Sequence, residues 1–184
     1  GVNLFRALLG FATGLSLGCY LGPSQYGNMS FLLGTFMGVR HILDMGTSLA
    51  FFTFLSQKPP AKAFISSFLT WILIQFLISL ILIDCLFPNQ WIVNIWQENE
   101  KLIILLAFAA TFMQNSVWPI FQNTGESQRQ THWAQSIGVV VAILHFLSVL
   151  VFWWTGILGL YAVFSAITIE YFLASSIARK KLVF

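Results

Sequence analysis

Six apolar stretches divide this chain, each close to or above the length that a helix needs to cross a bilayer. A helix of about 20 residues spans the ~30 Å hydrocarbon core, where every backbone polar group must be bonded within the segment. Hydrophobic residues make up 58% of the chain and charged residues 8%, with a mean hydropathy of +0.81. A soluble domain carries about 25% charged residues. The sequence therefore predicts an all-α polytopic membrane protein.

The expected spans alternate with short connections that contain Pro, Gly and polar residues. Their predicted bounds are residues 3–21, 27–56, 63–86, 102–121, 133–154 and 157–178. The second exceeds the ~30 Å core, so we expect it to tilt or protrude. The connection before Lys101 contains Trp91 and Trp96, and Trp favours the headgroup level, so an interfacial segment is expected there. Because the chain begins with Gly1 rather than Met, we expect residues 1–184 to be one six-helix bundle of a longer protein.

The basic residues divide unequally between the two sides of the expected bundle. Most basic residues fall on one side, and the other side carries Asp84, Glu98, Glu100 and Lys101. Cytoplasmic loops are enriched in Lys and Arg, so both ends of the chain are predicted to be cytoplasmic. Seven of the nine basic residues fall on that cytoplasmic side: Arg6, Lys58, Lys62, Arg129, Arg179, Lys180 and Lys181.

Polar side chains occur near the middle of most spans, at what should be one common depth. A charge near the bilayer midplane costs roughly 2.5–3.5 kcal/mol unless it is paired or faces a wet cavity. The shared depth suggests a polar lining inside the bundle, of the kind that a transporter for an anionic or proton-coupled substrate needs. These residues are Arg40, His41, Asp44, Gln75, Gln114, Asn115, His145 and Glu170.

Two roles follow from the chemistry of these side chains. The planar guanidinium of Arg40 suits bidentate binding of a phosphate. Asp44 or Glu170 would hold a proton or cation and gate the site, so coupling to H+ or Na+ is expected without any other cofactor. The amides and histidines complete the candidate substrate-binding set, which is His41, Gln114, Asn115 and His145 beside Arg40.

Each of these residues also has a purely structural interpretation. Arg40 and Asp44 are one helical turn apart, so they can form a salt bridge. Glu170 can pair with Arg40 or Lys180. His145 can be a buried histidine with its hydrogen bonds satisfied. The amides of Gln75, Gln114 and Asn115 can join neighbouring helices.

Glycines recur every four residues in the first span, at Gly10, Gly14, Gly18 and Gly22. On a helix they form a smooth ridge, which either lets another backbone approach closely or makes a thin wall beside a cavity. Cys19 and Cys85 lack the spacing of a metal site. The chain contains no nucleophile elbow, phosphate loop or metal-ligand set, so we expect neither an enzyme nor a bound metal.

Two short motifs resemble a known family. Leu21-Gly22-Pro23-Ser24-Gln25-Tyr26-Gly27 follows the glycine-rich span, and Asp44-Met45-Gly46 lies in the next one. Together they resemble the N-terminus of the polysaccharide flippases of the O-antigen and exopolysaccharide type, within the multidrug/oligosaccharidyl-lipid/polysaccharide exporter superfamily. Gln122-Asn123-Thr124-Gly125-Glu126 loosely resembles a further motif after the fourth helix. The rest of the chain agrees in span count and loop polarity.

The resemblance implies one lobe of a two-lobe, alternating-access fold in the cytoplasmic (inner) membrane. It implies transport of undecaprenyl-pyrophosphate-linked oligosaccharide for cell-surface polysaccharide, meaning lipopolysaccharide or exopolysaccharide. Arg6 at the cytoplasmic mouth would recruit this substrate, and Arg40 would contact its pyrophosphate or an acidic sugar. A polysaccharide polymerase and chain-length proteins are expected partners, and nucleic acid is not. Two other functions remain open, namely a cation-coupled multidrug exporter of the same superfamily and a non-transporting membrane scaffold.

Overall fold

The computed structural model describes residues 2–57, 62–83 and 99–182, and nearly all of them are helical. No strand occurs in these ranges, which confirms the all-α prediction. The elements in chain order are α1 (Val2–Asp44), α2 (Thr47–Gln57), α3 (Lys62–Ile81), α5 (Lys101–Phe112), the π-helix η2 (Met113–Val117), α6 (Trp118–Ser127), α7 (Thr131–Trp154) and α8 (Leu160–Leu182).

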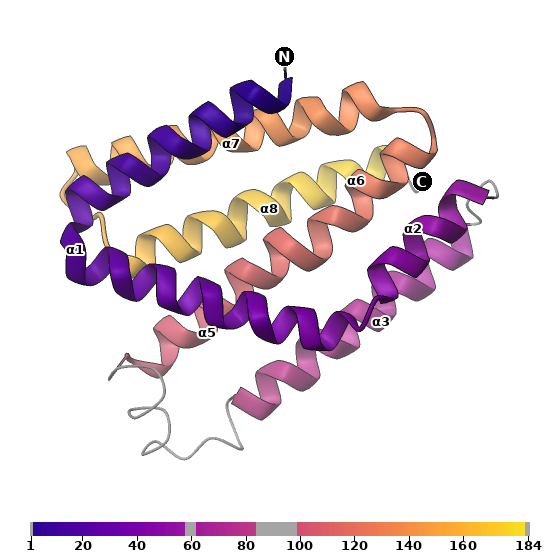
Figure 1. Ribbon diagram of the computed structural model, residues 1–184, viewed down its shortest axis with the longest axis horizontal. Coiled ribbons are helices and arrows are strands. Elements are labelled where there is room, and N and C mark those ends of the chain that lie inside the picture. The colour runs from indigo at the N-terminus through magenta and orange to yellow at the C-terminus, as the bar shows by residue number, and fades with distance from the viewer. Residues whose placement is uncertain (1, 58–61, 84–98, 183–184) are drawn as a thin grey trace.

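Helix α1 contains two arms that meet at a bend at Gly22 (Figure 1). Its 43 residues would extend roughly 65 Å as a straight helix, about twice the hydrocarbon core. Gly22 has φ 74° and ψ 168°, a conformation that is essentially restricted to glycine. Pro23 follows in the first turn of the second arm, where its missing N–H costs nothing. The expected connection over residues 21–27 is therefore a bend at one residue rather than a loop.

The expected helix over residues 27–56 is interrupted, because α1 ends at Asp44 and α2 begins at Thr47. Between them Met45 and Gly46 have φ values of 42° and 82°. Asp44 Oδ1 accepts hydrogen bonds from the Ser48 backbone N–H at 3.1 Å and from the Ser48 and Thr47 hydroxyls. The Asp44 carboxylate therefore satisfies one of the free backbone N–H groups in the first turn of α2, although it lies two residues before the N-cap position. The residues Asp44-Met45-Gly46 thus end α1, and the Asp44 carboxylate stabilises the start of α2.

The remaining elements follow the predicted spans with shifted ends. Elements α5, η2 and α6 form one rod from Lys101 to Ser127, which is longer than the expected 102–121. The end of the third span and the interfacial segment with Trp91 and Trp96 lie outside the described residues, apart from Leu82 and Ile83. Five helices in the described ranges are long and apolar enough to cross a membrane. One of them is α1, which holds all of the first expected span and most of the second.

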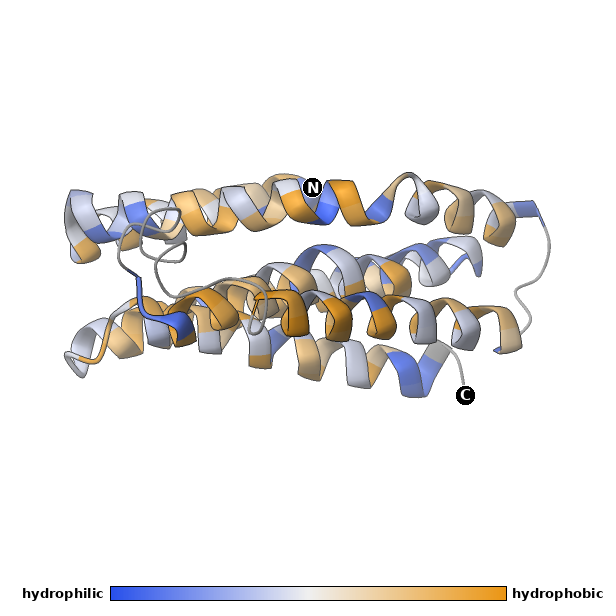
Figure 2. Cartoon of the chain, turned by 90° about the horizontal axis from the view of Figure 1, so that it is seen from below, coloured by the Kyte–Doolittle hydropathy of each residue, from blue (hydrophilic) through white to orange (hydrophobic). Residues whose placement is uncertain are grey.

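The helical passes run in alternating directions along the long axis (Figure 1). The end of α2, the start of α3, the α6–α7 turn and the end of α8 lie at one end, and the bend in α1 and the α7–α8 turn lie at the other. Apolar positions run along most of the helices (Figure 2), and many large apolar side chains point outward, including Phe11 and Ile42, each 71% exposed. Soluble monomers rarely expose apolar surface on this scale. The helices therefore indicate a multi-pass membrane protein.

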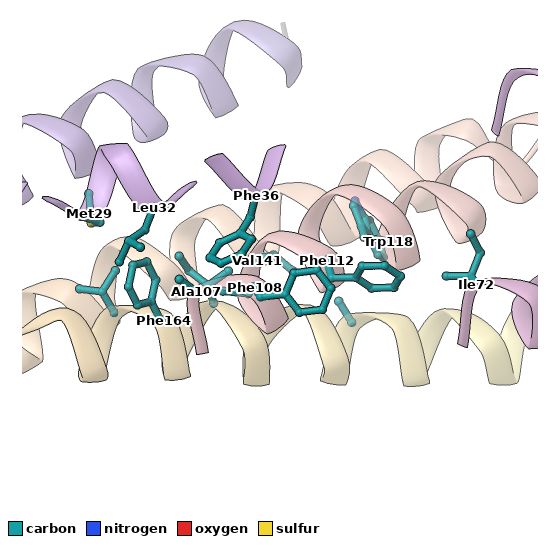
Figure 3. Packing of buried hydrophobic residues seen from close by; sticks show 14 of the residues in the cluster. Met29, Leu32, Phe36, Ile72, Ala107, Phe108, Phe112, Trp118, Val141 and Phe164 are labelled. Atoms are coloured by element: carbon teal, nitrogen blue, oxygen red, sulfur yellow. The ribbon is translucent and has the colours of Figure 1, made fainter. Parts of the chain in front are cut away.

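Aromatic rings join α1, α3 and α5. Figure 3 shows those of Phe36, Phe108 and Phe112. Phe108 contacts Phe36 at 5.5 Å between ring centroids, Phe76 at 5.6 Å and Phe112 at 5.6 Å. Phe36 and Phe108 are each 1% exposed. In a bilayer, where lipid tails are as apolar as the core, close packing of such rings rather than the hydrophobic effect holds helices together. This aromatic cluster joins the second arm of α1 to α3 and α5.

Candidate functional site

A cavity of about 490 Å³ lies between the first arm of α1, η2, α7 and α8. Its volume lies within the range of roughly 300–1,000 Å³ typical of small-molecule sites. Most of its wall is apolar, with several polar groups facing inward. The lining residues are Asn3, Arg6, Ala7, Gly10, Thr13, Gly14, Leu17, Met29, Leu33, Gln114, Gly138, Val141, Ala142, His145, Val163, Ile167 and Tyr171.

Two glycines of the first arm, Gly10 and Gly14, line this cavity and form a thin wall there. A Cβ atom added at Gly10 or Gly18 would meet nothing within 4 Å, and one at Gly14 would meet only the Tyr26 hydroxyl, at 3.8 Å. A ridge packed against another backbone would leave no such space. Gly10 and Gly14 line both the cavity and a second recess that Phe11 and Leu15 help to form. The structure thus favours the thin-wall interpretation.

Arg6 enters the cavity from α1 and lies across the surface of α7 at Gly138. A Cβ atom at Gly138 would approach Arg6 Cζ to 3.0 Å and Nη1 to 3.2 Å. The absence of a side chain at Gly138 therefore makes room for the guanidinium. Arg6 is partly buried, so the cavity contains a cation within reach of a bound molecule.

His145 is paired with Glu170 across the α7–α8 interface. His145 Nδ1 lies 2.9 Å from Glu170 Oε2, and the Ser148 hydroxyl donates to Glu170 Oε1 at 2.8 Å. The side chains of His145 and Glu170 are only 19% and 10% exposed. His145 lines the cavity, whereas Glu170 does not. The Glu170 carboxylate therefore contacts His145 on the side away from the cavity. Glu170 pairs with His145 rather than with Arg40 or Lys180, the two partners expected from the sequence.

Gln114 reaches the cavity from a widened turn of the rod. Its Nε2 donates to the Tyr171 hydroxyl of α8 at 3.3 Å. The local π-helix has a Trp118 N–H to Met113 carbonyl bond, five residues apart. Pro119 accounts for it, because proline has no N–H to give to the Asn115 carbonyl and its ring crowds that carbonyl. Such π-turns occur frequently at functional sites.

The structure does not bring the other predicted site residues into this cavity. Asp44 stabilises the start of α2 instead, and it forms no direct ion pair with Arg40 among the described residues. Arg40 Nε is buried without a hydrogen-bond partner. His41 is exposed. Asn115 donates to the Thr111 carbonyl of its own helix at 3.1 Å. The expected single polar ring is thus divided, and Arg6, Gln114 and His145 are the predicted residues that meet.

Sequence reasoning missed two members of the site, Gly138 and Tyr171. Tyr171 directly follows Glu170, which was predicted to lie at the depth of the site. The Tyr171 phenol could therefore have been included among the candidate polar residues at that depth. Gly138 carries no signal of this kind, because its role depends on Arg6 from a distant segment. Gln75, which was expected at the same depth, bonds the Leu43 carbonyl at 3.0 Å and satisfies the end of α1.

The cavity presents a guanidinium, an imidazole, an amide and a phenol to a bound molecule. Such a set suits a polar or anionic group, since the guanidinium donates to phosphate or carboxylate oxygens. Within the described ranges no group of three His, Cys, Asp or Glu side chains could hold a metal ion. Comparison with known proteins finds no matching family model, no matching curated protein and no matching solved structure.

Proposed function

We propose that this chain is one lobe of a flippase that moves undecaprenyl-pyrophosphate-linked oligosaccharide across the cytoplasmic membrane. The observation that carries the proposal is the position of Arg6 in a largely apolar cavity between helices that are long and apolar enough to span a bilayer. A cation within membrane-spanning helices costs several kcal/mol unless it faces a wet cavity or a partner. A chain that retains this cation beside a cavity is suited to an anionic substrate.

The proposed substrate fits the chemistry of the cavity lining. A pyrophosphate offers several acceptor oxygens to the forked Arg6 guanidinium. Sugar hydroxyls can exchange hydrogen bonds with the Gln114 amide and the Tyr171 phenol, which already form a contact at 3.3 Å. Alternating access requires a second surface to face this lobe. The proposal therefore includes a second six-helix lobe, a six-span count for this one, and both ends of residues 1–184 in the cytoplasm.

His145 and Glu170 form the proposed coupling site. His145 lines the cavity and its Nδ1 lies 2.9 Å from Glu170 Oε2, while the Ser148 hydroxyl donates to the other oxygen of that carboxylate. The proposed coupling ion is therefore H+ rather than Na+, because a partner set containing an imidazole suits a proton better than an alkali cation. Asp44 remains a predicted gating residue, and its hydrogen bond to the start of α2 is the contact through which it would act.

Arg6→Gln in the full-length protein tests this proposal. We expect glycan export to fall by about tenfold or more, the effect of losing one charge-assisted contact, at an unchanged membrane level. Export is measured as surface polysaccharide in cells that lack the wild-type gene. Arg129→Gln, in the exposed α6–α7 turn, is the matched control and should export normally. Wild-type export by Arg6→Gln would remove the cavity cation from the mechanism.

Arg40→Ala tests the prediction that Arg40 contacts the substrate, although Arg40 lies outside the cavity. If Arg40 contacts substrate in another conformation, its loss abolishes export at a normal membrane level. A non-transporting scaffold predicts instead that Arg40→Ala and Asp44→Ala lower the amount of protein together. Both outcomes are read from the same immunoblot and polysaccharide assay.

A cation-coupled multidrug exporter is the second candidate, favoured by the His145–Glu170 pair beside the cavity. The two functions respond oppositely to Arg6→Gln. Removing a positive charge weakens a site for pyrophosphate but improves a site for an organic cation, since like charges repel at short range. Ethidium efflux that rises in Arg6→Gln cells would therefore favour the exporter over the flippase.

A further inference from the structure

A separate recess of about 470 Å³ lies on the opposite faces of η2 and α8 from the cavity. It is bounded by α3, by the rod of α5, η2 and α6, and by α8, and it shares no lining residue with the cavity. Its wall is dominated by large apolar side chains. Four phenylalanines contribute to it, one or two from each boundary: Phe76, Phe112, Phe121 and Phe172. We refer to this recess as the α3–α8 groove.

The groove is elongated along the helices. On α8 its lining extends from Thr168 to Arg179, and on the rod from Ala109 to Phe121. At 1.5 Å per residue these intervals correspond to roughly 16–18 Å. This is about half of the ~30 Å hydrocarbon core, or the depth of one leaflet. A groove of this length and direction matches a single lipid chain lying parallel to its neighbours in the bilayer.

Apart from Thr168, whose hydroxyl donates to the Phe164 carbonyl of its own helix, the polar groups in the groove lie at one end. Ser175, Ser176 and Arg179 follow each other on the last turns of α8. Ser175 is 5% exposed, and its hydroxyl is buried without a hydrogen-bond partner. Arg179 is exposed at the mouth of the groove, and a guanidinium has five N–H donors, enough for a phosphate as well as another contact. An unsatisfied buried hydroxyl indicates that a further acceptor or donor belongs there.

We propose that the α3–α8 groove binds one anionic membrane phospholipid, with an acyl chain along the phenylalanines and the headgroup phosphate at Arg179. The charge pattern selects this occupant, because the groove is apolar over one leaflet and cationic at the end where a headgroup would lie. A transmembrane helix of a second copy would present apolar side chains along its whole length and leave the buried Ser175 hydroxyl without a hydrogen-bond partner.

Native mass spectrometry of the full-length protein tests the proposal. The purified protein is reconstituted in vesicles of palmitoyl-oleoyl phosphatidylglycerol or phosphatidylcholine and transferred to detergent. The lipid molecules that remain bound to each protein are then counted from its mass. We expect one phosphatidylglycerol to be retained in preference to phosphatidylcholine. Arg179→Gln should lower its retention by about tenfold, the effect of one charge-assisted contact. Lys180→Gln removes the same charge one residue away, outside the groove lining, and should retain nearly the wild-type amount.

A second variant tests the apolar part of the site without changing any charge. Ala109→Phe places a ring inside the groove and should abolish retention, while circular dichroism confirms a helical protein. Arg6→Gln should leave retention unchanged, since Arg6 lies in the separate cavity. Equal retention of the two lipids, an equal effect of Arg179→Gln and Lys180→Gln, or a lipid-free dimer would each overturn the proposal. So would retention of a polyprenyl phosphate in place of phosphatidylglycerol.

Discussion

Asp44 and Glu170 each accept hydrogen bonds from nearby side chains. Glu170 accepts from Ser148 and lies against His145, one helix away. Asp44 accepts from the backbone and hydroxyl of Ser48 and from Thr47. A carboxylate in a low-dielectric region requires such donors, because its desolvation costs several kcal/mol. The two acids thus have different roles, one joining two helices and the other beginning a new helix.

The His145–Glu170 contact should contribute measurably to stability. A double-mutant cycle with His145→Ala and Glu170→Gln is expected to give a coupling free energy of about 1 kcal/mol, typical of interhelical polar pairs in membranes. The free energy of unfolding is measured in mixed micelles. Ser136→Ala and Glu170→Gln serve as a control cycle, because the Ser136 hydroxyl bonds only the His132 carbonyl of its own helix. A coupling energy no larger than in the control would contradict the contact.

At the scale of the element, the bend in α1 determines where the cavity forms. The first arm runs beside α7, and the second arm packs on α5 (Figure 1). Gly22 changes the direction of the chain within one residue, which brings Met29 and Leu33 of the second arm to the same cavity as Arg6 and Thr13 of the first. Backbone conformation at a single glycine therefore closes one side of the site.

Gly22→Ala should destabilise the protein although there is room for the added methyl group. A Cβ atom at Gly22 meets nothing within 4 Å, so the cost arises from φ 74° alone, of order 1–3 kcal/mol. Gly18→Ala has equal space in a helical conformation and should be neutral or stabilising by up to about 1 kcal/mol. Unfolding free energies in mixed micelles compare the two. Equal effects would indicate that α1 continues straight through Gly22.

At the scale of the whole molecule, the connections sort by charge between the two ends. Lys62 begins α3, Arg129 lies in the α6–α7 turn, and the basic residues of α8 close the chain at the same end (Figure 1). The α7–α8 turn, at the other end, contains Thr155 and Gly156 and no charge. An uneven distribution of Lys and Arg sets the orientation of multi-pass proteins. The basic end is therefore expected to face the cytoplasm.

Cysteine labelling tests this orientation. In a background in which Cys19 and Cys85 are replaced by serine, Thr155→Cys should react with an impermeant maleimide in intact spheroplasts. Gln130→Cys, in the α6–α7 turn, should react only after lysis. Both positions are exposed, so accessibility of the side chain is matched. Labelling of both from the same side would contradict the predicted crossing of α7, and a reversed pattern would contradict the orientation.

Much of the fold follows from patterns within single segments. The apolar runs predict the helices, and the glycine and proline at positions 22 and 23 predict the change of direction between the first two spans. The break after Asp44 was also present in the sequence, since an acidic residue, a glycine and two hydroxyl residues form a stop followed by a cap. It was not predicted, because the apolar residues on both sides suggested one continuous span.

The candidate site was less predictable, because common depth does not establish a common location. Arg40 and His145 lie at similar predicted depths, yet one is outside the cavity and the other lines it. Helix rotation decides this, and each residue changes the facing direction by about 100°. The π-turn before Pro119 adds a further rotation that no regular periodicity gives. Gly138 becomes part of the site only through its contact with Arg6.

The sequence by itself determined the class of protein, the approximate spans and the grouping of basic residues, because length, hydropathy and charge act locally along the chain. The tertiary structure alone decided which polar residues meet. Arg6, Gln114, His145 and Tyr171 come from four separate helical segments, and only the Gly22 bend, the π-turn and the packing of aromatic rings bring them around one cavity. Contacts between distant segments depend on helix rotation and close packing, which a local pattern does not specify.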